Sequence, residues 1–348
     1  MMKNSATSAV STEFSVFFGC TLTVITIIGT LVNLFVIIAV LGDRKMRQSS
    51  MNILLLSLAV ADMLYVISFV YAWLPILIYG NGTWMFPDIL CAPVRYLSSA
   101  FLTVSTVTYM TICIERYIAL IHPLKATRLC SRKNVIITII LTWTIILLFD
   151  LPYFFLYETV TYFGQSTASY CINPYSYEGH LYWLIYKWVE FAISYAIPCV
   201  VSVVLYAIIC RNLWFRDDTI HNDFSRMSTS NENSNDTSRT EVDNISARRN
   251  VVKMLIVCVI VFNTAYTPMV SILVYQTIWK QKPSILTFET FLVVVSLVIG
   301  ISAFNPFLYT LFSKTFRKRA NEIITCSESR RFPTTTYPTS VKTVSSSV

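Results

Sequence analysis

VFFGCTLTVITIIGTLVNLFVIIAVL, at residues 16–41, contains no charged side chain. Apolar stretches of about 18 or more residues with few charges are typical of helices that cross a membrane. Six further blocks of this kind follow, at residues 52–79, 91–121, 134–156, 182–212, 250–278 and 288–311. Because backbone N–H and C=O groups need internal partners in lipid, each block should be a helix. The sequence therefore predicts an all-α membrane protein, a bundle of seven transmembrane helices.

The composition also favours a membrane protein over a soluble one. Of the 348 residues, 55% are hydrophobic and 13% are charged, whereas soluble domains carry roughly 25% charged residues. The nine cysteines contain no Cys-x-x-Cys pair, and His122, His180 and His221 lie far apart. A zinc or metal-hydrolase centre would therefore lack ligands. We see no catalytic pair within the blocks, and we expect no enzyme activity.

The distribution of basic residues predicts the orientation of the chain. One set of connections is rich in Lys and Arg, and cytoplasmic loops carry such an excess. The opposite side holds only Lys3, Arg95, Lys187, Lys280 and Lys282. We therefore expect residues 1–15 to be extracellular and the C-terminus cytoplasmic, at the plasma membrane. The net charge of +8 then reflects topology, and nucleic acid is not expected as a partner because the basic residues are scattered at helix ends.

Three segments outside the spans have distinct compositions. Within the seven-helix domain 16–312, residues 216–249 are rich in Ser, Asn, Asp and Thr and should form a flexible third cytoplasmic loop, and residues 327–348 should form a disordered tail. Both could carry phosphorylation sites or be plain solvated linkers. Between the last span and the tail, residues 313–326 suit an amphipathic helix that lies on membrane lipid. Cys326, at its end, is a candidate for palmitoylation.

Polar residues and prolines inside the apolar blocks are informative because polar groups are costly in hydrocarbon. They recur in a fixed order along the chain, which is Asn33, Asp62, Glu115-Arg116-Tyr117, Trp143, Pro198 with Tyr206, Phe262 with Tyr266 and Pro268, and Asn305-Pro306-Phe307-Leu308-Tyr309.

Taken together, these residues resemble the rhodopsin-like (class A) G-protein-coupled receptors, and in particular invertebrate neuropeptide receptors. In that family the third helix ends in Asp/Glu-Arg-Tyr and the seventh carries Asn-Pro-x-x-Tyr. The resemblance runs from about Gly29 to Arg319. It implies a receptor that transmits the binding of an extracellular ligand to a heterotrimeric G protein, with arrestin and a receptor kinase as further partners.

The resemblance also implies how the signal passes. At rest Arg116 should pair with Glu115. An agonist would favour an outward swing of the sixth helix, after which Arg116 faces the G protein, supported by Tyr206 and Tyr309. Physically, the ligand biases a bundle that has two arrangements by binding one of them better. Phe262 and Tyr266 form the aromatic pair that transmits ligand contact, although Tyr266 stands where most relatives have Trp.

A disulfide is expected between Cys91 and Cys171. Cys91 lies 25 residues before Arg116, which is roughly 37 Å along a helix. If Arg116 lies at the inner face, Cys91 lies at the outer face, and the loop that contains Cys171 is also outside, where disulfides form. The family has the same bridge.

Asp62 suggests an allosteric sodium ion, since the family binds Na⁺ there. Ser105 and Asn305 match two further positions of that site, whereas Ile301 stands where many relatives have a polar residue. The alternative is a carboxylate held by waters and neighbouring side chains.

Two residues that other receptors use to bind their ligands are missing from this sequence, which narrows the class of ligand. Ser98 replaces the aspartate that pairs with amine ligands, and no lysine lies between Thr287 and Leu311, which excludes a retinal Schiff base. Trp84-Met85-Phe86 and the aromatic segment around Cys171, which we expect to form a hairpin, resemble peptide receptors.

Glu190 lies eight residues before Pro198, so its carboxylate could enter the pocket and pair with a basic peptide. Alternatively it reaches the interface or pairs with Lys187. Other pocket candidates are Ser98, Tyr266, Gln276, Tyr275 and Tyr71.

The ligand could be a lipid or another small non-amine molecule. A seven-helix transporter or channel is disfavoured because we find no internal repeats. Asn81 is a candidate for glycosylation, and Ser346-Ser347-Val348 fits the terminus that a PDZ protein binds.

Overall fold

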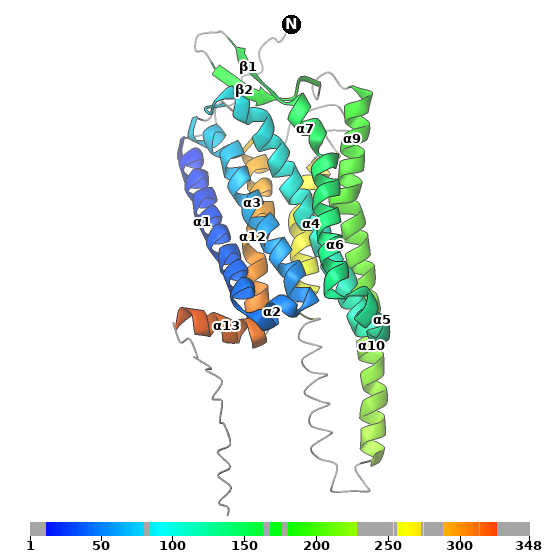
Figure 1. Ribbon diagram of the computed structural model, residues 1–348. Coiled ribbons are helices and arrows are strands. Elements are labelled where there is room, and N and C mark those ends of the chain that lie inside the picture. Colours follow the sequence, from blue (N-terminus) through cyan, green and yellow to red (C-terminus); the bar gives the residue numbers. More distant parts are fainter. Residues whose placement is uncertain are drawn as a thin grey trace, which may run out of the picture.

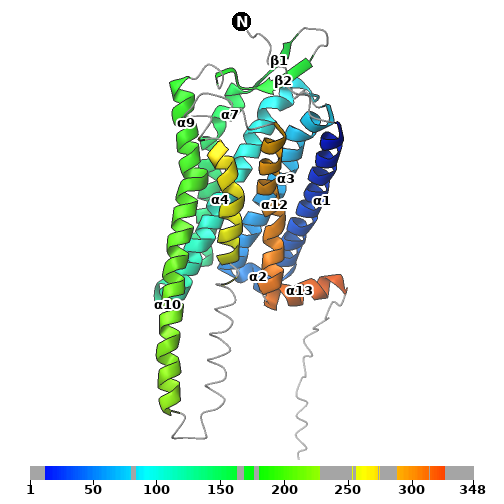
Figure 2. The ribbon, with the colours of Figure 1, turned by 180° about the vertical axis from the view of Figure 1, so that it is seen from behind.

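The computed structural model describes residues 12–79, 84–162, 168–175, 180–227, 253, 256–272, 274, 288–312 and 314–325. Most of these residues are helical (Figures 1 and 2). In chain order the elements are α1 (Thr12–Gly42), α2 (Arg44–Gln48), α3 (Ser50–Tyr79), η1 (Asp88–Leu90), α4 (Cys91–Ile121), α5 (Pro123–Leu129), α6 (Arg132–Phe149), α7 (Leu151–Leu156), β1 (Glu158–Tyr162), β2 (Ala168–Ile172), α9 (Leu181–Phe191), η2 (Ala192–Ala196), α10 (Ile197–Met227), the unlabelled helix Ile256–Ile272, α12 (Phe288–Phe312) and α13 (Lys314–Ile324).

The long helices stand side by side and form the predicted bundle (Figures 1 and 2). Among the described residues, five helical stretches are long and apolar enough to cross a membrane, and two shorter apolar helices, Ile256–Ile272 and Ser296–Pro306, accompany them. Each of the seven predicted blocks overlaps one of these stretches. The structure thus has the helical membrane bundle that the sequence predicts.

The fourth and fifth blocks are not single regular helices. The fourth is divided at Asp150, after which α7 begins with Pro152 in its first turn, where the missing N–H of proline is tolerated. The fifth contains a wider π-helical turn, η2, directly before Pro198. Because Pro198 cannot donate a hydrogen bond to the carbonyl of Ser194, a wider turn at this point adjusts the hydrogen-bond ladder.

The fifth helix is longer than the sequence suggested. We predicted a flexible third cytoplasmic loop over 216–249, and α10 continues into this segment as far as Met227. Once a helix has formed, each residue that is added to it gains one backbone hydrogen bond. The helix can therefore continue past the membrane even where the sequence is polar. The rest of the predicted loop lies outside the described residues.

The interior of the bundle is held by one large apolar cluster and a few polar links. The cluster joins α1, α3, α4, α10, the helix Ile256–Ile272 and α12. Asn33 donates to the carbonyl oxygens of Gly29 and Ser302, at 2.9 Å each, and so ties α1 to α12. Trp143 donates through its indole nitrogen to Ser57 Oγ at 3.0 Å and ties α6 to α3. Polar contacts of this kind fix which faces of the helices meet.

At one end of the bundle β1 and β2 form an antiparallel hairpin, in register from Glu158 opposite Ile172 to Tyr162 opposite Ala168. This hairpin confirms the expectation for the segment around Cys171. At the other end α13 lies across the bundle (Figure 1), as expected for the amphipathic helix after the last span. Phe316 is buried and faces the bundle core.

Close packing between α1 and α12 yields a testable prediction at Gly29. A Cβ atom there would lie 3.2 Å from Cβ of Ala303 and 3.6 Å from Cγ1 of Val66. We expect Gly29→Val to cost about 1–3 kcal/mol of stability through overpacking and to lower the melting temperature of the detergent-purified protein by several degrees. The matched control is Gly19→Val in the same helix, where no atom lies within 4 Å. Equal melting temperatures for the two variants would contradict the packing argument.

Candidate functional site

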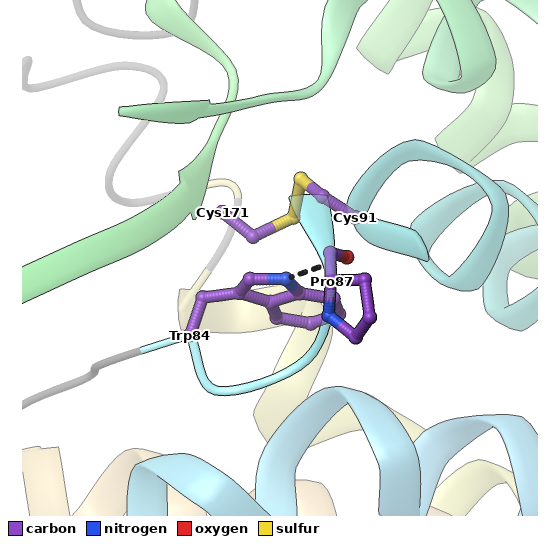
Figure 3. The surroundings of a disulfide bond; sticks show 4 residues. All are labelled: Trp84, Pro87, Cys91 and Cys171. Carbon is purple, nitrogen blue, oxygen red and sulfur yellow. Dashed lines mark hydrogen bonds between the residues drawn. A yellow bond between two sulfur atoms is a disulfide. The ribbon is translucent and has the colours of Figure 1, made fainter. Parts of the chain in front are cut away.

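The predicted disulfide joins the hairpin to the start of α4. Cys91 and Cys171 form the bridge, with Cα atoms 5.5 Å apart. Trp84 is buried against it and donates through its indole nitrogen to the carbonyl oxygen of Pro87 at 3.4 Å (Figure 3). The backbone N–H of Trp84 also donates to the carbonyl of Ser169 in β2. The hairpin is therefore fixed at this end of the bundle by a covalent bond and by a packed indole.

Below the hairpin, Glu190 is the centre of a polar network between α4, α7 and α9. Its carboxylate lies 2.5 Å from Lys187 Nζ, accepts from the Tyr153 hydroxyl at 2.9 Å, and is 3.4 Å from Ser99 Oγ. The ammonium of Lys187 also lies over the rings of Tyr153 and Trp183. The ion pair with Lys187 is one of the two alternatives that the sequence left open for Glu190. The side chain of Lys187 is 30% exposed and that of Glu190 is 13% exposed, so neither is fully enclosed by the protein.

A second acid, Asp150, supports this network from the break between α6 and α7. It is fully buried and accepts a hydrogen bond from the Tyr186 hydroxyl at 3.0 Å. Tyr186 stacks on Phe149 and on Trp183. Asp150 and Tyr186 thereby hold α9 against the end of α6.

The other pocket candidates differ in their surroundings. Ser98 is next to Ser99, and its buried hydroxyl has no hydrogen-bond partner in the described part of the chain. Tyr71 is half exposed and its ring meets that of Phe86 edge to face. Tyr275 and Gln276 lie outside the described residues. The structure therefore brings Glu190 within 3.4 Å of Ser99 on the third helix, directly next to the candidate Ser98 in the sequence.

A series of stacked aromatic rings runs from η2, just after the helix that carries Glu190, to the centre of the bundle. Tyr195, in η2, stacks on Tyr266 at 6.3 Å between ring centroids, and its hydroxyl is 2.8 Å from Thr267 Oγ1. Tyr266 stacks on Phe262 at 4.4 Å, and Phe262 stacks on Tyr109 of α4 at 5.4 Å. The predicted aromatic pair, Phe262 and Tyr266, is thus in contact. The two residues are one helical turn apart and precede Pro268 in the same helix.

Asp62, Ser105 and Asn305 meet at the buried centre, as the sodium hypothesis requires. The two carboxylate oxygens of Asp62 accept one hydrogen bond each, from Ser105 Oγ at 2.6 Å and from Asn305 Nδ2 at 2.9 Å. Asp62 is fully buried. Ile301, which is also buried, contributes no oxygen to this centre. The three polar residues come from α3, α4 and α12, so the cluster links three helices.

At the opposite end from the hairpin, Arg116 and Glu115 form a two-point ion pair. Arg116 donates from Nε to Glu115 Oε2 at 2.5 Å and from Nη2 to Oε1 at 2.8 Å. Tyr117 contacts His122 through its hydroxyl at 3.5 Å. Tyr206 is buried in the same apolar cluster as Cys113 and Cys258. Pro306 lies within α12, and Tyr309 belongs to the same helix.

Sequence reasoning missed three tyrosines that make these contacts, Tyr109, Tyr153 and Tyr195. Tyr109 lies seven residues before Arg116, which is about two helical turns, so helical spacing could have placed both residues on the same face of the third helix. Tyr153 follows the break at Asp150, and Tyr195 lies in the π-helical turn η2. Both irregularities rotate the chain, so regular spacing could not indicate their orientation. The predicted modification sites at Asn81 and Cys326 lie outside the described residues.

Comparison with known proteins decides the family. The model of the "7 transmembrane receptor (rhodopsin family)" matches residues 32–309. The chain belongs to the rhodopsin family of seven-transmembrane receptors. The receptor is 36% identical to Neuropeptide receptor 15 of Caenorhabditis elegans over 91% of its own length and 92% of that protein.

More distant relatives of the receptor cover nearly as much of the chain. It is 28% identical to the thyrotropin-releasing hormone receptor of Mus musculus over 92% of its length and 82% of the relative. It is 24% identical to Galanin receptor 2a of Danio rerio over 90% of its length and 79% of the relative. These proteins are receptors rather than enzymes, and they establish the receptor as a G-protein-coupled receptor with neuropeptide-receptor relatives.

The Glu115–Arg116 pair yields a second prediction. We expect Glu115→Gln to raise ligand-independent G-protein signalling, because the amide cannot replace the charged acceptor that holds the guanidinium. Loss of about 1–2 kcal/mol of bias towards the resting arrangement corresponds to an increase of up to about tenfold in basal signal. The measurement is basal second-messenger accumulation at matched surface expression, with Glu13→Gln, an exposed acid at the start of α1, as control. An unchanged basal signal would show that the pair does not restrain the receptor.

Proposed function

We propose that the receptor binds an extracellular peptide at the hairpin end of the bundle and activates a heterotrimeric G protein at the end that carries Arg116. The observation that carries this proposal is the 36% identity, over nine-tenths of both chains, to a neuropeptide receptor. The disulfide-held hairpin, with aromatic and charged side chains beneath it, supports it because a peptide offers both apolar and polar groups to such a surface. A lipid ligand would make less use of the charged network.

The orientation follows from the positive-inside rule. Exposed basic side chains gather on α2, α5, α13 and the start of α6, all at the end opposite the hairpin. We infer that this end is cytoplasmic at the plasma membrane and that the N-terminus is extracellular. Arrestin, a receptor kinase and a PDZ protein remain proposed partners through the Ser- and Thr-rich tail, which lies outside the described residues.

We infer that Glu190 is the acidic contact of the peptide and that a basic group of the ligand exchanges with Lys187 for its carboxylate. Both side chains are partly exposed, and they belong to the same helix, so Lys187 can swing away without any change in the backbone. Tyr153 and Ser99 would keep the carboxylate in place during the exchange. Charge-assisted hydrogen bonds of this type give both affinity and a defined direction of approach.

We propose that the Asp62 centre binds a sodium ion. Hard cations take oxygen ligands. The carboxylate of Asp62 and the hydroxyl of Ser105 supply such oxygens, and the amide of Asn305, which donates its nitrogen to Asp62, would turn its oxygen to the ion. Waters would take the place of a ligand from Ile301. A bound sodium ion would supply a positive charge that stabilises one arrangement of α3, α4 and α12.

The sodium proposal predicts a specific salt effect. A ligand that binds the folded protein raises its stability, so we expect a higher melting temperature of the purified receptor in sodium chloride than in potassium chloride at equal ionic strength. Asp62→Asn should abolish the difference, whereas the control Asp43→Asn, outside the bundle, should keep it. The same melting temperature in both salts for the unmodified receptor would exclude the ion.

The ligand proposal is tested by screening neuropeptides on cells that express the receptor, with calcium and cAMP readouts, followed by a double-mutant cycle on Lys187 and Glu190. We expect Glu190→Gln to reduce potency for a basic peptide by about tenfold or more and Lys187→Gln to increase it, because the carboxylate is no longer occupied.

The cycle distinguishes recognition from a structural role. If the ion pair only stabilises the bundle, both single variants should lose potency and surface expression together, and the double variant, which has no unpaired charge, should recover both. That result would overturn the exchange at Glu190 and leave peptide activation itself intact.

A further inference from the structure

Asp150 is a buried acid to which the proposed function gives no role. It lies at the break between α6 and α7, at the hairpin end of the bundle (Figures 1 and 2), and is fully buried. One carboxylate oxygen, Oδ1, accepts from the Tyr186 hydroxyl at 3.0 Å. The other, Oδ2, has no hydrogen-bond partner among the residues that the structure describes. A buried polar atom without a partner is costly, so this oxygen needs an explanation.

Asp150 lies close to the ion pair of Lys187 and Glu190. Tyr186, which binds Asp150, directly precedes Lys187 in α9. Its ring contacts that of Tyr153 edge to face, with 5.9 Å between the centroids. Nζ of Lys187 in turn donates to the Tyr153 hydroxyl at 2.7 Å. Asp150 interacts electrostatically with both members of the ion pair. The network therefore contains a second carboxylate near the same ammonium.

The ammonium of Lys187 can change its acceptor without a change in the backbone. It is a point charge at the end of a flexible four-carbon stem. Besides Glu190, it contacts the rings of Tyr153 and Trp183, at 5.3 Å and 5.7 Å from their centroids. Aromatic rings attract cations, so the ammonium keeps favourable contacts while it moves between the two carboxylates.

The exchange at Glu190 requires a second acceptor. When a cationic group of the ligand takes the carboxylate of Glu190, Lys187 loses its partner and is repelled by the new charge. A largely buried charge that loses its partner is strongly destabilising. That loss would work against ligand binding unless another carboxylate receives the ammonium. Asp150 supplies a carboxylate oxygen that is still without a donor.

We propose that Asp150 is this second acceptor, so that the ammonium of Lys187 pairs with Glu190 in the free receptor and with Oδ2 of Asp150 when a cationic ligand group occupies Glu190. The inference rests on the proposed function for the ligand contact at Glu190. It makes Asp150 a positioning residue, which acts through Lys187 and does not touch the ligand. It also requires a positive charge on the ligand, since a neutral donor would leave Glu190 uncompensated once Lys187 has moved.

The first test needs no ligand and is therefore independent of the proposed function. Melting temperatures of the purified full-length receptor are compared for Glu190→Gln, Asp150→Asn and the two together. The amide oxygens still accept from the Tyr153 and Tyr186 hydroxyls. If each acid can replace the other, each single variant should lose no more than about 2 °C, and the double variant about 5 °C more than the sum, because its ammonium has no acceptor.

Two further variants make this result decisive. Lys187→Gln added to the double variant removes the unpaired ammonium and should restore the melting temperature, or the expression if the double variant does not fold. The matched control is Glu190→Gln with Asp62→Asn, because Asp62 is equally buried but its hydrogen bonds come from uncharged side chains; these losses should be additive. Additive losses for Glu190 with Asp150, or no recovery with Lys187→Gln, would overturn the second acceptor.

The second test follows the exchange with a small probe. N-acetyl-arginine amide carries one guanidinium and no other charge, whereas N-acetyl-citrulline amide has nearly the same shape and no charge. A compound that binds the folded receptor raises its melting temperature, and we expect this rise for the arginine compound only. Asp150→Asn should raise the concentration that gives half of the rise by about tenfold or more. In a receptor with Lys187→Gln, which has no ammonium to move, Asp150→Asn should change nothing.

The outcomes separate the inference from the proposed function. An equal effect of Asp150→Asn with and without the ammonium of Lys187 would show that Asp150 acts only through Tyr186, and would overturn the second acceptor. Stabilisation by both compounds would overturn the requirement for a positive charge. No effect of the arginine compound, together with the expected ligand-free losses, would count against the ligand contact at Glu190 and in favour of two acceptors for Lys187.

Discussion

Hydrocarbon provides no hydrogen-bond partner for the backbone, and this constraint shapes the entire receptor. Every span is helical in the residues that the structure describes, and the two departures from a regular helix lie next to a proline. Pro152 follows the break at Asp150, and Pro198 follows the π-turn. These two irregularities orient Tyr153 and Tyr195, and through them the network around Glu190 and the stacked aromatic rings on Tyr266.

Since lipid is as apolar as the helix surfaces, burial of apolar area does little to select which helices meet. Close packing and polar links do this work here. Gly29 lets α1 approach Ala303, Asn33 bonds to α12, and Asp62 joins three helices through Ser105 and Asn305. Because these links are few and central, a change in any of them can shift the balance between two arrangements of the bundle.

The charged groups at the two ends have different surroundings. At the hairpin end Glu190 is matched by Lys187 and two hydroxyls, so its charge is compensated. At the other end Arg116 is matched by its neighbour Glu115, and exposed basic side chains lie on α2 and α13. The two central ion pairs are thus compensated, whereas basic groups without an acid beside them lie at one end of the bundle.

The sequence by itself determined the number and position of the spans, the expected orientation, the family and the identity of Cys91, Asp62, Arg116 and Asn305 as key residues. These follow from local hydrophobicity and from motifs that occupy consecutive residues. Only the tertiary structure decided which partner each polar group has. Glu190 contacts Ser99 and Tyr153, which are 91 and 37 residues away in the sequence. The structure also shows that α10 continues to Met227, past the end of the predicted apolar block at residue 212. Contacts across helices depend on the rotation of each helix about its axis, and the break at Asp150 and the π-turn set that rotation.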